Sequence, residues 1–287
     1  MSKRSSSKQS IVPLPGGLMP KKIHQSPYHA LSTSSKMIGQ GANACVYYPP
    51  LPCLMPKELD AEFNPPDHFV MRTGSLPPNV SQISKLRSRI NTLPLRDREA
   101  FILPYPQVCT KYETKDIAPC PTLVSQQADQ PNTKLVTYGT YLPLVLGEPA
   151  ESYKFENDAA LKTFLSSLWK AFLNLQRLGV IHSDLHLGNV LVTKTNQAII
   201  IDWDDVAFLD EELEVWKANP SRQESSRSHD LKMLQRELMG WKVLQEKADM
   251  SDSWSHMYGS LVDIPTSPPP SFDTLEHFQS IIDALPT

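Results

Sequence analysis

The sequence predicts an α+β protein, and three stretches of hydrophobic pattern carry this prediction. Residues 37–47 read as a strand, a Gly-rich turn and a second strand, the pattern of a β-hairpin. Residues 157–179 place Leu and Phe side chains three and four positions apart, which is the spacing of one buried face of a long α-helix. Two short apolar runs at 190–192 and 198–201 flank a polar turn and predict another hairpin.

Composition bounds the class of protein. The 287 residues, 40% of them hydrophobic, are enough for one two-lobed domain or two small ones. With a net charge of −3 the chain has no overall basic field, so we expect no nucleic-acid partner. No run of eighteen apolar residues occurs, and we therefore expect no membrane span. The basic first eight residues precede a stretch too broken by Pro and Gly to be a secretory signal.

The cysteines give no sign of a metal site. They form no C-x-x-C pair and have no nearby His at zinc spacing. We therefore expect four free thiols in a reducing compartment, the cytoplasm. The residues concerned are Cys45, Cys53, Cys109 and Cys120.

The ends of the chain differ from its middle. Residues 1–34 are rich in Ser, Pro and Lys without apolar periodicity, which predicts a disordered arm. A Pro-rich insertion is expected at 48–67. Residues 266–287 comprise a Pro-rich linker and a short helix whose apolar face is expected to pack back on the domain.

The polar residues with the clearest spacing lie around the second hairpin. Residues 182–189 read His-Ser-Asp-Leu-His-Leu-Gly-Asn, and the apolar run after Asn189 ends thirteen residues later on Asp202. The hairpin would bring Asn189 and Asp202 side by side, where both side chains can reach one magnesium ion. The alternative is that these are ordinary turn residues and a strand cap, but four polar positions at this spacing argue against it.

This pattern, H-x-D-L-x-x-x-N followed by an apolar strand and Asp, resembles the catalytic loop and metal-binding Asp of the protein-kinase-like superfamily. The resemblance implies that Asp184 accepts or orients a substrate hydroxyl. Asn189 and Asp202 are implied to hold Mg²⁺ against the phosphates of ATP. His182 is implied to brace the loop.

Details of the loop resemble compact or small-molecule kinases. His186, which we place with Asp184 in the catalytic set, stands where protein Ser/Thr kinases carry a phosphate-contacting Lys. Ser183 replaces the Arg that pairs with a phosphorylated activation segment. Only 28 residues separate Asp202 from Asp230, so the C-terminal lobe is expected to be compact and independent of activation-loop phosphorylation. Asp230 is expected to brace the loop, to cap a helix, or to do both.

Upstream, residues 39–46 resemble the nucleotide loop G-x-G-x-x-G-x-V with Ala in the third Gly position. Glycine there lets the backbone approach phosphates and adopt turn conformations. An apolar strand leading into a Gly-containing turn at 137–142 is expected to be the hinge whose backbone holds adenine. The residues assigned to ATP on this resemblance are Gly39, Gly41, Ala44, Val46, Arg72, Tyr138 and Gly139.

Arg72 is the largest departure from the family pattern, because it stands where the family has a nucleotide-binding Lys. The exchange is not conservative. Either Arg72 or a displaced Lys, such as Lys57 or Lys36, serves the phosphates, or nucleotide binding is impaired. The helical stretch 84–90 contains no acid, and Glu99 is the expected partner of this position, with a solvated surface charge as the alternative.

The Asp-Trp-Asp-Asp run at 202–205 replaces D-F-G, so that Trp203 supplies aromatic packing and Asp204 or Asp205 adds charge near the metal.

The resemblance implies an N-terminal lobe at 35–142 with an antiparallel sheet, a helical C-terminal lobe at 143–265, and ATP between them. We expect a monomer. The Pro-Pro-Leu-Pro-Cys run at 49–53 resembles a segment of kinase-like proteins of large DNA viruses, and if the chain is viral we expect it in the host cytoplasm or the virion.

Three functions remain open. The first is transfer of the ATP γ-phosphate to protein Ser/Thr hydroxyls, favoured by the Gly-rich loop ending in Val46. The second is a small-molecule kinase of the aminoglycoside or choline type, favoured by His186 and the Asp-Trp-Asp run. The third is a pseudokinase scaffold, motivated by Arg72 and the missing glutamate.

Overall fold

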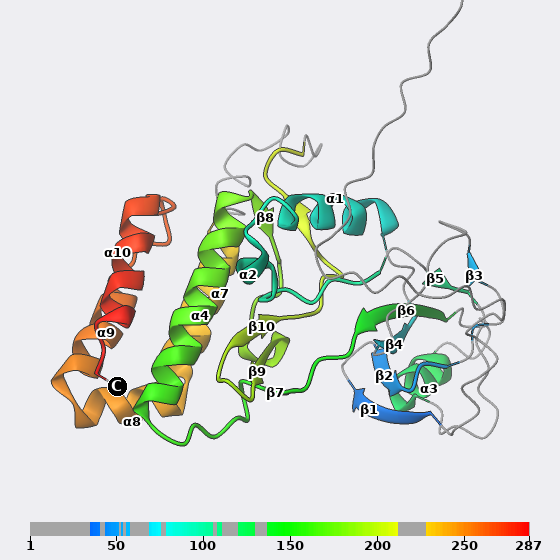
Figure 1. Ribbon diagram of the computed structural model, residues 1–287, viewed down its shortest axis with the longest axis horizontal. Helices are drawn as coiled ribbons and strands as arrows, with labels where there is room; N and C mark the ends of the chain where they lie inside the picture. Colours follow the sequence, from blue (N-terminus) through cyan, green and yellow to red (C-terminus); the bar gives the residue numbers. More distant parts are fainter. Residues whose placement is uncertain are drawn as a thin grey trace, which may run out of the picture.

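The computed structural model describes residues 35–40, 44–51, 53, 56–57, 69–75, 79–105, 108–110, 120–129, 137–211 and 228–286. It confirms the α+β class, with a strand-rich part formed early in the chain beside a helical part formed later (Figure 1). The expected arm at 1–34, Gly41 and most of the insertion at 48–67 lie outside the described residues.

The strand-rich part is one antiparallel sheet of six strands in the order β1-β2-β4-β6-β5-β3. β1 and β2 form the hairpin predicted at 37–47, and β4 and β6 are the central strands. The strands are β1 (Lys36–Gln40), β2 (Ala44–Tyr48), β3 (Pro56–Lys57), β4 (Phe69–Gly74), β5 (Val108–Cys109) and β6 (Tyr138–Pro143). Helix α3 (Pro121–Asp129) packs on β2.

Helix α1 (Val80–Ile90) follows the sheet in sequence but packs with the helical part. The Asn79 side chain caps its start by accepting the Gln82 N–H at 3.2 Å. Leu86 and Ile90 are buried in the same core as the long helix α4 (Asp158–Arg177), whereas the sheet has its own core. The short helix α2 (Leu95–Arg98) follows α1.

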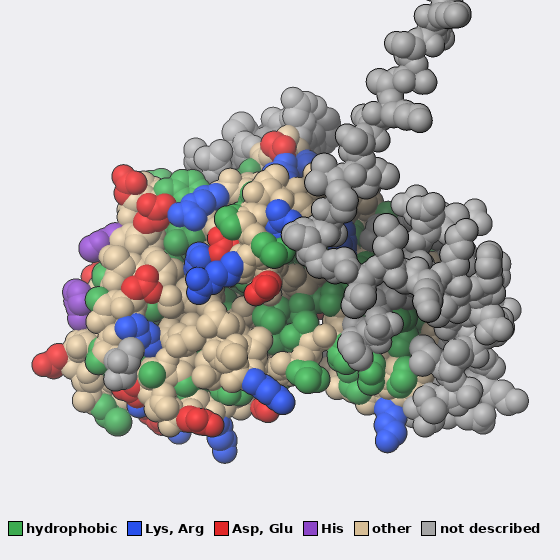
Figure 2. Space-filling view, viewed as in Figure 1, with side chains coloured by type: hydrophobic (Ala, Val, Ile, Leu, Met, Phe, Trp, Pro, Cys, Tyr) green, Lys and Arg blue, Asp and Glu red, His purple; other side chains and the backbone are tan. Residues whose placement is uncertain are grey.

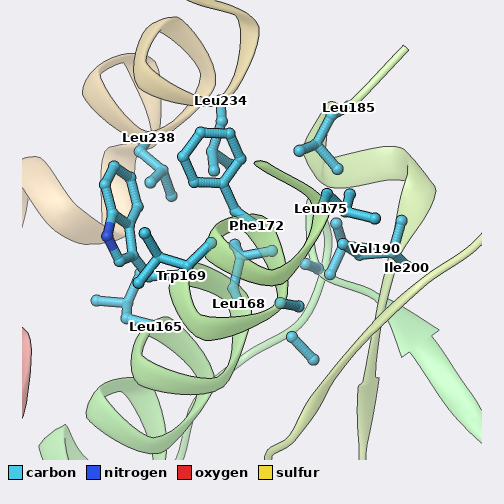
Figure 3. Close-up of a cluster of buried hydrophobic side chains, with 14 of the residues drawn as sticks. Leu165, Leu168, Trp169, Phe172, Leu175, Leu185, Val190, Ile200, Leu234 and Leu238 are labelled. Carbon is cyan, nitrogen blue, oxygen red and sulfur yellow. The ribbon is translucent and has the colours of Figure 1, made fainter. Parts of the chain in front are cut away.

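The helical part is built around α4 (Asp158–Arg177), the helix predicted at 157–179. Asn157 caps it, accepting the Ala160 N–H at 2.9 Å, and Gly179 follows its end with a φ of +61°. The predicted apolar face lies in the core (Figure 3). Labelled residues of this core are Leu165, Leu168, Trp169, Phe172, Leu175, Leu185, Val190, Ile200, Leu234 and Leu238.

The predicted second hairpin is also present. β9 (Val190–Thr193) pairs antiparallel with β10 (Ala198–Ile200), and β7 (Gly147–Pro149) joins the other edge of β9. The turn between β9 and β10 contains Asn196 with a φ of +56°. A separate pair of short strands, β8 (Val180–Ile181) and β11 (Ala207–Phe208), lies on either side of the candidate site in sequence.

Four helices complete the described chain: α7 (His229–Gly240), α8 (Lys242–Met250), α9 (Asp252–Val262) and α10 (Phe272–Asp283). α10 is the predicted C-terminal helix, and it packs against α4 and α9. The Trp169 ring of α4 lies 4.5 Å from the Phe278 ring, and its Nε1 donates to the Leu275 carbonyl at 2.9 Å. The end of the chain is thereby fixed to the central helix.

The prediction of four free thiols is wrong, because the cysteines form two disulfides. Cys45 of β2 bonds to Cys120 at the start of α3, and Cys53 bonds to Cys109 of β5. The partners are 75 and 56 residues apart in sequence, so local spacing could not reveal them. The argument for a reducing compartment rested on free thiols and no longer holds.

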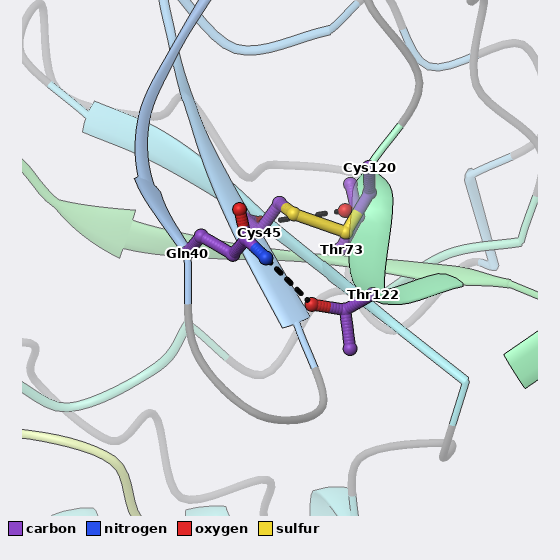
Figure 4. The surroundings of a disulfide bond; sticks show 5 residues. All are labelled: Gln40, Cys45, Thr73, Cys120 and Thr122. Carbon is purple, nitrogen blue, oxygen red and sulfur yellow. Dashed lines mark hydrogen bonds between the residues drawn. A yellow bond between two sulfur atoms is a disulfide. The ribbon is translucent and has the colours of Figure 1, made fainter. Parts of the chain in front are cut away.

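The first disulfide lies in a small network that attaches α3 to the sheet (Figure 4). Gln40 donates to the Thr122 hydroxyl at 3.2 Å, and the Thr73 hydroxyl donates to the Cys45 carbonyl at 3.3 Å. The disulfide and the Gln40 bond therefore link β2 and β1 to α3, and the Thr73 bond joins β4 to β2.

Acidic and basic side chains are interspersed over the visible face of the helical part (Figure 2). Within the described ranges, no helix is both long enough and apolar enough to span a membrane.

Candidate active site

The loop at 182–189 is attached to helix α7 by a buried carboxylate. Asp230 Oδ2 accepts the His182 N–H at 2.7 Å, and Oδ1 accepts the Ser183 N–H at 2.9 Å. Ser183 has a φ of +71°, so these bonds hold the backbone in a conformation that non-glycine residues rarely adopt. Burial raises the pKa of Asp230, an effect that His182 and the two backbone N–H groups oppose. Asp230 thus braces the loop, while Ser228 occupies the N-cap position of α7.

His182 is fully buried and packs against the ring of Trp203, with 4.6 Å between centroids. Its Nδ1 accepts the Asp184 N–H at 3.3 Å, so Nε2 carries the hydrogen that points to the Ile201 carbonyl at 2.9 Å. The ring therefore connects the loop to the segment that leads into Asp202. This is the bracing geometry expected of His182.

The loop brings Asp184 and Asn189 together. Asn189 Nδ2 donates to the Asp184 carbonyl oxygen at 2.9 Å and to its carboxylate Oδ2 at 3.0 Å. Both bonds use the amide nitrogen, which leaves Asn189 Oδ1 as the atom that can face a cation.

His186 lies beside the same carboxylate. Its Nε2 is 3.5 Å from Asp184 Oδ2, and its Nδ1 accepts the Gly188 N–H at 3.1 Å. A Cβ atom on Gly188 would stand 2.8 Å from His186 Cε1, so only glycine leaves room for the ring in this position.

Asp202 follows β10 with a φ of +64°. The Ile201 N–H donates to the Asn189 carbonyl at 3.0 Å, which aligns the two arms of the hairpin at the candidate metal residues. Burial raises the pKa of Asp202, the cation of Arg72 lowers it, and the nearby Asp204 and Asp184 carboxylates raise it again.

The oxygen atoms of Asn189 and Asp202 are hard donors of the type that Mg²⁺ prefers. Within the described ranges, no group of three or more His, Cys, Asp or Glu side chains is arranged to hold a metal ion. Mg²⁺ in nucleotide sites commonly takes one or two protein ligands and completes its shell with phosphate and water oxygens. The donor set therefore fits Mg²⁺ bound together with a nucleotide.

The residues assigned to ATP fall on two faces of the sheet. Val46 of β2 lies opposite Gly39 of β1 on one side and opposite Arg72 of β4 on the other. Two residues further along these strands, Ala44 lies opposite Gly74, which in turn lies opposite Tyr138 of β6. Directly paired residues point to the same face. Five of the assigned residues thus share one face of the sheet, namely Gly39, Ala44, Val46, Arg72 and Tyr138.

Gly139 does not belong to that group, and the turn expected at 137–142 is absent. Residues Tyr138–Pro143 form the central strand β6, which has Gly139 on its core side. A Cβ at Gly139 would stand 2.7 Å from Met71 Sδ, so the glycine is needed for close packing. The connection to the helical part follows at 144–146.

Gly39 does not lie in a turn, although we expected glycine there for a turn conformation. It lies within β1, and a Cβ would meet Val46 Cβ at 3.7 Å, an ordinary contact. Neither space nor a turn conformation therefore demands glycine at this position.

Arg72 pairs with residues that the sequence did not assign to it. Its guanidinium contacts Asp204 at 2.6 and 3.1 Å and Asp202 at 3.3 Å. Glu99 is exposed at the end of α2 and is not one of these partners, so the expectation that it pairs with Arg72 is wrong. Of the two alternative lysines, Lys36 is exposed on the edge strand β1, and the side chain of Lys57 lies outside the described residues.

Sequence reasoning also missed the role of α1. Arg89 donates to the carbonyls of Leu178 and Gly179 at 2.6 and 3.3 Å and pairs with Asp210. Lys85 pairs with Asp210 and Glu211, and both cations lie over the Phe208 ring. The basic residues within 84–90 were the only sequence signal for this role. In the structure, Lys85 and Arg89 pair with acidic residues of the segment that follows the candidate site.

Part of the chain is similar to a known protein family. No curated protein matches the chain. A family model described as "Phosphotransferase enzyme family" (APH) matches residues 122–242, less than half of the 287 residues. The match spans α3 to α7 and includes the whole candidate site from 182 to 202. Over that stretch the chain is similar to a phosphotransferase family of the protein-kinase-like superfamily.

Proposed function

We propose that the protein transfers the γ-phosphate of ATP to a hydroxyl group. The observation that carries this proposal is the joining of Asn189 to the Asp184 carboxylate at 3.0 Å, next to the hairpin that ends on Asp202. Phosphoryl transfer depends mainly on positioning and on neutralising phosphate charge, and these three side chains supply both.

Each residue has a separate task. Asp184 orients the acceptor hydroxyl and takes its proton as the oxygen attacks phosphorus. Asn189 Oδ1 and the Asp202 carboxylate would hold Mg²⁺, which neutralises phosphate charge when it is bound. Arg72, on the sheet face shared with Val46, directs its cation to the phosphates. His182 and Asp230 keep the loop in its bent conformation.

Two acceptor classes have support. The resemblance of residues 39–46 to the nucleotide loop of protein kinases favours Ser/Thr hydroxyls of a protein. The second candidate, a small-molecule alcohol, is favoured by the match to the phosphotransferase family and by His186 at the position of the protein-kinase Lys. Transfer of ³²P from γ-labelled ATP to protein substrates or to amino-sugar and amino-alcohol acceptors separates the two classes.

The test of catalysis itself is the pair of variants Asp184→Asn and Asp202→Asn, with Asp249→Asn as the control. Asp249 is an exposed carboxylate of α8 and forms no ion pair with the residues the structure describes. We expect transfer to be lost in the first two variants and retained in the control. Retained transfer in Asp202→Asn would refute the role of that residue. A parent protein that binds ATP without transferring phosphate to either class would be a pseudokinase.

A further inference from the structure

Arg72 contacts two carboxylates, and the two contacts differ in kind. Nη1 and Nη2 donate to the two oxygens of Asp204 at 3.1 and 2.6 Å, whereas Nη2 alone reaches Asp202 at 3.3 Å. Two parallel hydrogen bonds fix the plane of a guanidinium, and one long bond does not. We propose that Asp204 is a positioning residue that holds Arg72 for the phosphates of ATP. This inference rests on the proposed function.

No helix of the N-terminal lobe takes this task in the described chain. α1 has no acid in its first turn and carries Arg87 and Arg89 in its last turn. Its buried side chains Leu86 and Ile90 belong to the core of the helical part, so α1 does not present a carboxylate to the sheet. The partner of Arg72 comes instead from the segment after Asp202.

The pairing explains why this position holds Arg. A lysine ammonium is a point charge that can approach one carboxylate oxygen closely, but it cannot form the planar two-bond contact that Asp204 receives. Arg in place of Lys at position 72 and the missing helix glutamate therefore have one explanation. The planar guanidinium of Arg72 pairs with the carboxylate of Asp204, which lies 132 residues later in the chain.

The backbone at Asp204 is held in place by the neighbouring residue, Trp203. Trp203 is buried, and its Nε1 donates to the Ile102 carbonyl at 2.8 Å. The Asp204 side chain itself is 43% exposed, so it can hold Arg72 without the cost of full burial. A site is positioned well when its supporting residues are held by packing and hydrogen bonds.

In this arrangement Arg72 can still bind phosphate and Asp202 can still bind a cation. A guanidinium has five N–H groups, and the contacts with Asp202 and Asp204 use three of them. The others can bind phosphate oxygens. Because Arg72 keeps its two bonds to Asp204, Asp202 can give up its single 3.3 Å contact to a cation without leaving the guanidinium unpaired.

The experiment is a double-mutant cycle on ATP binding with Mg²⁺, measured by isothermal titration calorimetry. It compares the parent, Arg72→Lys, Asp204→Asn and the double variant, with Asp249→Asn at an exposed position of α8 as the control. We expect each single change to weaken binding on the order of tenfold, since both disrupt a charge-assisted bond. The double variant should bind no more than about tenfold more weakly than the parent, because both changes remove the same interaction. Asp249→Asn should stay within about twofold of the parent.

The unfolding midpoint without ligand separates positioning from a purely structural role. A structural role would lower the midpoint of Asp204→Asn and leave its Kd for ATP unchanged, and that result would overturn the inference. Multiplicative effects in the double variant, about a hundredfold, would also overturn it. Asp204→Glu retains the carboxylate and should recover part of the affinity. A parent that does not bind ATP would overturn the proposed function itself, whatever the variants do.

Discussion

The carboxylate of Asp230 accepts the backbone N–H of His182 at 2.7 Å, and this bond joins helix α7 to the loop that carries Asp184. The same carboxylate accepts the Ser183 N–H. One buried side chain therefore satisfies two backbone donors at the point where the chain bends with a positive φ.

Asp230→Asn tests this brace. The amide has one acceptor oxygen in place of two, so one buried N–H loses its partner while the side-chain volume stays nearly constant. We expect the free energy of unfolding to fall by about 2 kcal/mol and phosphate transfer to fall with it. Urea unfolding at neutral pH measures the first effect. An unchanged unfolding midpoint would show that the two bonds contribute little.

The raised pKa of Asp230 predicts a pH dependence with a definite sign. From the ordinary Asp pKa of about 3.9 up to the raised folded value, the folded state binds the proton more tightly than the unfolded state. The contribution of Asp230 to the free energy of unfolding is therefore complete below the unfolded pKa and falls as pH rises through the folded pKa.

Asp230→Asn removes this titration. We expect the difference in stability between the parent and Asp230→Asn to be larger at low pH than at neutral pH. Unfolding curves of both proteins across that range give the difference directly. A difference that grows as pH rises would contradict the predicted direction of the pKa shift.

Arg89→Met tests whether α1 holds the region around the candidate site. The change removes hydrogen bonds to the carbonyls of Leu178 and Gly179 at the end of α4 and the ion pair with Asp210. Met retains a long apolar side chain near Phe208. We expect a loss of about 2 kcal/mol in the free energy of unfolding and faster amide hydrogen exchange in residues 207–211. Arg96→Met, at an exposed position of α2, is the control and should leave both unchanged.

The sequence predicted those features that depend on neighbours in the chain. The spacing of apolar residues was enough for α4, and two apolar runs around a polar turn were enough for the β9–β10 hairpin. The same hairpin placed Asn189 and Asp202 near each other. Local chemistry determines these elements.

The predictions that failed depended on contacts between distant residues. Gly139 looked like a turn signal, but it is needed because Met71 of a neighbouring strand occupies the space of a side chain. The helix that includes 84–90 was found, yet its sequence does not show that its buried face joins the core of α4. Arg72 and Asp204 are 132 residues apart, so no local pattern could pair them.

The disulfides give a prediction about the sheet. Cys45–Cys120 closes a loop of 75 residues, and in the chain-entropy account its removal should cost about 4 kcal/mol. We expect Cys45→Ser/Cys120→Ser to lower the urea midpoint of the oxidised protein. Dithiothreitol, which also reduces Cys53–Cys109, should lower the midpoint of the parent further. Mass spectrometry after alkylation without reductant checks the premise. Four alkylated thiols in the folded protein would contradict both disulfides.

Gly188→Ala tests the placement of His186. An added Cβ would stand 2.8 Å from His186 Cε1 and 3.0 Å from Nδ1, so the ring must move away from Asp184. We expect phosphate transfer to fall on the order of tenfold, because small misplacements of reacting groups are costly. Gly259→Ala is the control, since nothing lies within 4 Å of an added Cβ in the middle of α9. It should raise the free energy of unfolding by about 1 kcal/mol and leave transfer unchanged. Full activity in Gly188→Ala would mean that the position of His186 beside Asp184 does not matter for the reaction.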